Sequence, residues 1–122
     1  MTKLQVPIKR KYDLEERTAK FGEGVIKLCM KIPKNEVTRP IIIQLVKAAT
    51  SVGANYCEAD DSVSKKDFKN KIGICKKESR ESKHFLRMLT VALPELKGEI
   101  MLHWDEAKEL NLIFNAIYIK VK

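Results

Sequence analysis

The stretch Ser64 to Leu89, SKKDFKNKIGICKKESRESKHFLRML, decides the fold, because its residue types repeat with the period of a helix. At roughly 100° per residue, apolar and small side chains recur at alternating spacings of four and three and fall on one line. That line consists of Phe68, Ile72, Cys75, Ser79, Ser82, Leu86 and Leu89. Such spacing is typical of a helix that buries one side in a bundle.

The basic residues of this stretch gather on a different side from the apolar line. Between positions 65 and 87, lysine and arginine outnumber aspartate and glutamate by nine to three, in a chain whose formal net charge is +8. Cations sorted onto one face suggest a polyanionic partner. We predict that nucleic acid contacts this face through a set called here the basic stripe: Lys65, Lys66, Lys69, Lys76, Lys77, Arg80, Lys83 and Arg87.

The basic stripe also has a simpler interpretation, since lysine-rich helix faces are often only solvated surface. The sequence pI near 9.4 and a second basic cluster at Lys9, Arg10 and Lys11 favour the nucleic-acid interpretation. No aromatic residue is interleaved with the stripe along this helix, so base stacking is not indicated. The expected mode of binding is contact with phosphates without readout of the bases.

Two further helices are predicted before this stretch. Asp13 and Glu16 have the spacing of a capping box and should begin the first helix, which residues 33–35 end. Residues 38–40 place a proline in the first turn of the second helix, which stops at 60–61. The expected buried residues are Leu14, Thr18, Phe21, Val25, Leu28 and Ile32 in the first helix, and Ile41, Leu45, Ala48, Ala49, Val52, Tyr56 and Ala59 in the second.

The third helix should begin after a cap at Ser64, and Pro94 and Gly98 should end it. We expect a loose connector over 94–104 and a fourth helix that starts between Glu99 and Asp105. Its buried residues should be Leu110, Ile113, Phe114, Ile117 and Val121. Four helices without a period-two strand predict an all-α, antiparallel up-down four-helix bundle over residues 12–122, preceded by a basic tail at 1–11.

The sequence offers no constellation for catalysis. Neither histidine has a partner at the spacing of a triad or a metal site, and the three cysteines lie far apart, as expected of small core residues. We therefore expect no enzyme, cofactor or metal. A polar layer between the second and third helices should fix their register instead: Gln44, Ser51, Asn55, Glu58, Lys71 and Glu78.

Apolar runs last only about four residues, too short for a bilayer span, and the first eleven residues lack the apolar segment of a signal peptide. A cytoplasmic protein without a membrane partner is expected. The second and fourth helices carry more apolar residues than one buried face requires. The surplus residues are Ile43, Val46 and Ala54 in the second helix, and Leu112, Tyr118 and Ile119 in the fourth. They predict a homo-oligomer that covers them.

The chain resembles the four-helix bundle proteins encoded within intervening sequences of bacterial 23S ribosomal RNA genes. The resemblance lies in residues 39–59 and 64–82, supported by Tyr12-Asp13-Leu14 with Phe21 and by Asn115-Ala116-Ile117. The chain is also similar to the accessory variability determinant of diversity-generating retroelements. This resemblance implies a left-handed bundle assembled as a ring-shaped homopentamer.

The same resemblance implies two functions from different classes. One is binding of nucleic acid, with structured RNA such as ribosomal RNA expected in preference to DNA, by a non-enzymatic bundle. The other is a protein-interaction scaffold that docks a partner such as a reverse transcriptase.

Overall fold

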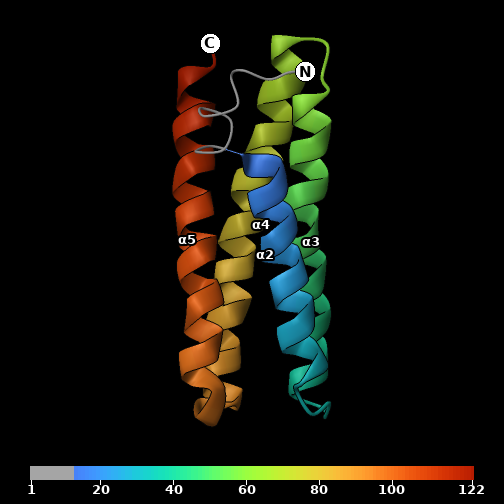
Figure 1. Ribbon diagram of the computed structural model, residues 1–122, viewed down its shortest axis with the longest axis vertical. Helices are drawn as coiled ribbons and strands as arrows, with labels where there is room; N and C mark the ends of the chain where they lie inside the picture. Colours follow the sequence, from blue (N-terminus) through green and yellow to red (C-terminus); the bar gives the residue numbers. More distant parts are fainter. Residues whose placement is uncertain (1–12) are drawn as a thin grey trace.

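The computed structural model describes residues 13–122 as four helices and one short 3-10 turn. The helices run alternately down and up and lie side by side (Figure 1), so the predicted all-α up-down four-helix bundle is confirmed. The predicted tail at 1–11 lies outside the described residues. The elements are α2 (Leu14–Met30), α3 (Thr38–Asp60), α4 (Lys65–Ala92), η1 (Pro94–Leu96) and α5 (Lys97–Lys120).

Side-chain caps fix where α2 and α4 begin, and a side-chain hydrogen bond from the preceding turn supports the start of α3. The Asp13 carboxylate accepts a hydrogen bond from the Glu16 amide at 3.2 Å, and the Ser64 hydroxyl accepts one from the Asp67 amide at 3.0 Å. Before α3, the Asn35 side-chain oxygen accepts from the amide of Thr38 at 2.9 Å. These bonds satisfy backbone donors that have no partner within their own helix. The predicted starts of the first three helices are confirmed.

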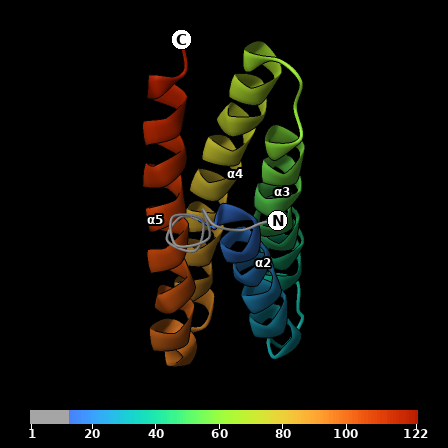
Figure 2. The same cartoon turned by 45° about the horizontal axis from the view of Figure 1, so that its top comes forward.

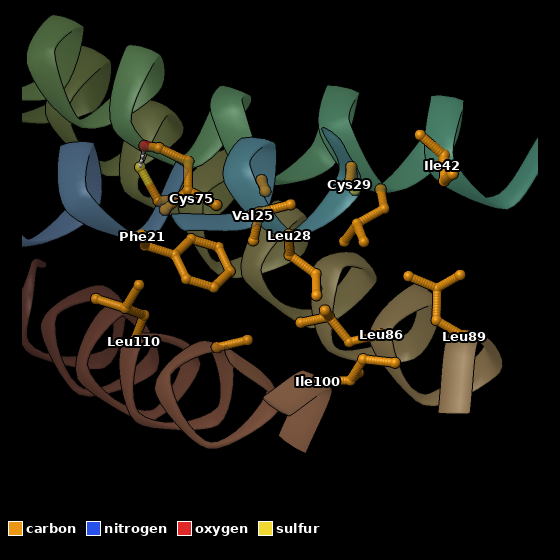
Figure 3. Close-up of a cluster of buried hydrophobic side chains, with 14 of the residues drawn as sticks. Phe21, Val25, Leu28, Cys29, Ile42, Cys75, Leu86, Leu89, Ile100 and Leu110 are labelled. Carbon is orange, nitrogen blue, oxygen red and sulfur yellow. Dashed lines mark hydrogen bonds between the residues drawn. The ribbon is translucent and has the colours of Figure 1, made fainter. Parts of the chain in front are cut away.

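The core is built from the predicted apolar lines. In Figure 3, side chains of α2, such as Phe21 and Leu28, point towards Leu86 of α4 and Leu110 of α5. All six predicted residues of the first helix are buried. In α4 every predicted core residue is buried except Phe68, which is half-buried against the core. Burial of these side chains is the main force that holds the bundle together.

The α4–α5 connection differs from the sequence prediction. The expected loose connector over 94–104 is wrong, because only the turn Pro94–Leu96 separates the two helices. α5 begins at Lys97, so the predicted start between Glu99 and Asp105 is also too late. Ile100 is fully buried, so its packing extends α5 towards the turn, and Gly98 lies in the first helical turn.

Two smaller expectations also need correction. The cysteines are not all core residues: Cys29 and Cys75 are buried, whereas Cys57 is exposed on α3. Burial raises the pKa of Cys75 to about 12. Among the surplus apolar residues, Val46 and Tyr118 pack against the core, because they lie where α3 and α5 meet their neighbours. Ile43, Leu112 and Ile119 are exposed as predicted.

Candidate nucleic-acid interface

The basic stripe divides into an outer and an inner row along α4. Five of its eight members are exposed: Lys65, Lys66, Lys77, Arg80 and Arg87. The other three, Lys69, Lys76 and Lys83, are half-buried and spaced seven residues apart. Seven residues are nearly two turns, so these three lie in a line along the helix. α5 packs against α4 (Figure 2). The inner row lies on the side of α4 that faces α5, because all three lysines approach aromatic rings of that helix.

Two aromatic rings from α5 lie under the inner row. The Nζ atoms of Lys69 and Lys76 lie 4.7 Å and 5.1 Å from the centre of the Tyr118 ring. The Nζ of Lys83 lies 5.5 Å from the Trp104 ring, and Lys108 of α5 approaches the same ring at 5.8 Å. These are cation–π distances. No aromatic residue is interleaved with the stripe on α4 itself, but these two rings of α5 adjoin it, so the sequence-based inference against base stacking overlooked the neighbouring helix.

Asn111 connects the two helices between the rings. Its side-chain Nδ2 donates to the backbone carbonyl of Lys76 at 2.8 Å and approaches the Ser79 hydroxyl at 3.3 Å. Trp104, Asn111 and Tyr118 are themselves seven residues apart, so they form a line on α5 that faces the inner row. Sequence reasoning missed these three residues, although their spacing was visible.

A glycine makes room for one of the rings. A Cβ atom at Gly73 would lie 3.1 Å from Cε1 of Tyr118, closer than side chains ordinarily pack. Gly73 lies four residues after Lys69 and three before Lys76, so its missing side chain leaves a notch between the two lysines. The ring of Tyr118 fits against this notch, which explains how both ammonium groups come to lie near one ring.

Ion pairs neutralise few cations of the basic stripe, although they neutralise several basic residues elsewhere on the bundle. Lys71 pairs with Glu58 at 2.7 Å, Arg17 pairs with Glu106 at 2.7 Å, and Lys31 pairs with Glu99. Within residues 13–122, the stripe's one ion pair is a 3.9 Å contact between Lys77 and its neighbour Glu78. The remaining stripe cations have no carboxylate within ion-pair distance in this part of the chain. Their charge therefore stays available to a ligand.

The predicted polar layer between α3 and α4 is only partly assembled. Lys71 and Glu58 pair directly, but Asn55 donates to the Ser51 carbonyl of its own helix at 2.9 Å. Gln44 is exposed. Glu78 is half-buried, and its pKa is raised by burial and then by the nearby charge of Glu81. The six residues thus lie along one interface without forming a single hydrogen-bonded network among the contacts described.

A shallow hollow borders the outer row where α4 meets α3. It measures about 530 Å³ and is lined by Gln44, Lys77, Arg80, Glu81, His84 and Phe85. His84 meets the Phe85 ring edge-on, with 5.2 Å between ring centres. Two members of the stripe, Lys77 and Arg80, therefore reach solvent beside a concave surface that also carries a carboxylate.

From 13 to 122, no three histidine, cysteine, aspartate or glutamate side chains are grouped to hold a metal ion. Over the same residues, no helix combines the length and the apolar character needed to cross a bilayer.

Similarity to known proteins identifies the family of the chain. Residues 10–97, well over half of it, match the family described as 23S rRNA-intervening sequence protein. The chain belongs to this family. The matched segment contains the whole basic stripe but stops at the start of α5, so Trp104, Asn111 and Tyr118 lie beyond it. A search of curated proteins finds no match to the chain.

A solved structure supports the fold of this family member. It is a protein of unknown function from the S23 ribosomal protein family of Bacteroides thetaiotaomicron VPI-5482. The TM-score is 0.74 at 23% sequence identity, and the alignment covers 85% of this chain and 96% of the other. The likeness extends over most of both chains and concerns the fold alone.

Proposed function

We propose that this family member is a non-enzymatic bundle that binds RNA through the basic stripe of α4. The observation that carries the proposal is the alignment of eight cations along one helix, of which, within residues 13–122, only Lys77 has a carboxylate, that of Glu78, within ion-pair distance. Neighbouring cations without internal partners repel one another and favour a polyanionic ligand. The family's description, which refers to 23S ribosomal RNA, supports RNA in preference to DNA.

The length of the stripe suits a nucleic-acid backbone. From Lys65 to Arg87 it spans about 33 Å of helix at 1.5 Å per residue. The exposed outer row can approach phosphates without disturbing the core, since its members project from the bundle surface. Contacts of this kind supply affinity and orientation but carry no base sequence. We therefore expect the structured RNA to be recognised by charge and shape.

Direct binding by the purified protein tests this proposal. A fluorescently labelled structured RNA, such as a 23S ribosomal RNA helix with its loop, is titrated with protein that has been freed of nucleic acid by a high-salt wash. We expect saturable binding at low salt with no other protein present. Absence of binding at low salt would contradict the proposal.

A protein-interaction scaffold is the second candidate, and exposed apolar side chains favour it. Leu102, Leu112 and Ile119 of α5 are 69%, 53% and 68% exposed, and Met30 of α2 is 76% exposed. On this alternative, the bundle docks a partner such as a reverse transcriptase, and RNA binding would require that partner. The direct titration separates the two, because a scaffold alone would leave the labelled RNA unbound.

The same exposed apolar residues lead us to propose that the protein is a homo-oligomer. Separate apolar surfaces on different helices suit head-to-tail contacts, which close into a ring. The resemblance noted above suggests five subunits. Light scattering coupled to size exclusion should give a mass several times the 14.0 kDa of one chain at micromolar concentration. A stable monomer would contradict assembly, whereas a dimer or tetramer would contradict only the count of five.

A further inference from the structure

Two parallel lines of residues face each other where α4 meets α5. The α4 line consists of Lys69, Lys76 and Lys83, and the α5 line consists of Tyr118, Asn111 and Trp104 in matching order. Each line repeats every seven residues, so the two rings are separated by about 21 Å along α5. We call these six residues the α4–α5 ladder.

We propose that the α4–α5 ladder binds an unpaired stretch of the RNA, with bases stacked on Tyr118 and Trp104 and phosphates held by the lysines. This inference rests on the proposed function and names the part of the RNA that the stripe contacts. Alternating cations and aromatic rings are the usual composition of surfaces that bind single strands. In structured RNA, unpaired bases occur in loops, bulges and ends.

The ladder rings are reachable, because both are only half-buried. One part of each ring packs against the core, and lysine ammonium groups lie over the ring. A lysine side chain is flexible and can swing away from a ring. When a base stacks on the ring, the displaced ammonium groups can contact the adjacent phosphates, so cation–π contacts are exchanged for base stacking and charge-assisted phosphate contacts.

A duplex does not fit this surface in the same way. Its bases are already paired and stacked, so it presents mainly phosphates and sugars to a protein. The stripe's outer row could contact such a backbone, but the two rings would gain nothing. The two rings should therefore make the protein prefer an unpaired strand, a preference that the charge of the stripe alone does not provide.

The test uses the full chain and an RNA of about 12 nucleotides without self-complementarity, within the size range of single-strand sites. It compares this strand with the same strand hybridised to its complement. Trp104→Leu and Tyr118→Leu remove the rings, and Trp104→Phe and Tyr118→Phe are the matched controls that keep a ring. Circular dichroism verifies that each variant folds.

We expect the parent to prefer the single strand and each leucine variant to weaken single-strand binding roughly tenfold. Duplex binding should change less than roughly twofold, the phenylalanine variants should stay near the parent, and the salt dependence should be unaltered, because the phosphate contacts remain. Trp104 is the chain's only tryptophan. The single strand should therefore quench the fluorescence of the unmodified protein, and this measurement requires no variant.

Three results would overturn the inference while leaving the proposed function intact. In the first, the parent protein binds the duplex more tightly than the single strand. In the second, the leucine variants lose affinity for both RNA forms equally and show a shallower salt dependence. In the third, the leucine variants bind RNA like the parent. The second would mean that the rings only position the lysines. A parent protein that binds neither RNA form at low salt would instead overturn the proposed function itself.

Discussion

Reversing three exposed charges of the stripe should weaken RNA binding by at least about a hundredfold. The triple variant Lys77→Glu, Arg80→Glu and Arg87→Glu changes only exposed side chains of the outer row, so the core and the ladder stay intact. Each lost phosphate contact costs on the order of 1 kcal/mol, and three such losses correspond to about a hundredfold. Fluorescence anisotropy with the labelled RNA measures the effect.

The matched control reverses three exposed lysines on other helices. Lys20→Glu, Lys27→Glu and Lys47→Glu give the same formal net charge but leave the stripe untouched. This control should bind within a fewfold of the parent. Equal loss of affinity in both variants would mean that net charge alone attracts the RNA, and the assignment of binding to the outer row of α4 would then fail.

Truncating the core should produce the largest change in stability. Leu86 of α4 is fully buried in the core near Leu28 and Ile100 (Figure 3), and Leu45 is fully buried in α3. Replacing either by alanine should lower the free energy of unfolding by about 2–5 kcal/mol, through lost apolar burial and the cavity left behind. Denaturant unfolding followed by circular dichroism, at one fixed protein concentration, measures the loss.

Val91→Ala is the matched control on the same helix as Leu86. Val91 is 78% exposed, so its truncation should change the free energy of unfolding by less than about 0.5 kcal/mol. If Leu86→Ala and Leu45→Ala were equally mild, the core described here would be misplaced. A fall in RNA affinity in a core variant that remains folded would point to a coupling that the bundle geometry does not explain.

The sequence predicted the first three helices because their signals are local. The caps at Asp13 and Ser64, the proline-containing turn at 38–40 and the four-three spacing of apolar residues all act within a few residues. The connector before α5 was predicted wrongly, since Pro94 and Gly98 usually break helices. Burial of Ile100, a tertiary effect, outweighs the local preference of Gly98.

Only part of the candidate site could be predicted from the sequence. Charges sorted along one helix reveal a stripe, because all its members share that helix. Which rings lie beside the stripe depends on how α5 packs against α4, and periodicity within one helix carries no such information. The notch at Gly73, which admits Tyr118, likewise becomes meaningful only when both helices are in place.

The salt dependence of RNA affinity tests the central claim most directly, because it counts the phosphates that the protein neutralises. Five stripe cations are exposed. At about −0.7 to −0.9 per phosphate contact, these five cations predict a slope of about −3.5 to −4.5 for structured RNA in a plot of log affinity against log salt. A linear plot with a slope steeper than about −3 is the expected result. A slope between zero and about −1 would contradict the claim that the basic stripe of α4 binds the RNA backbone.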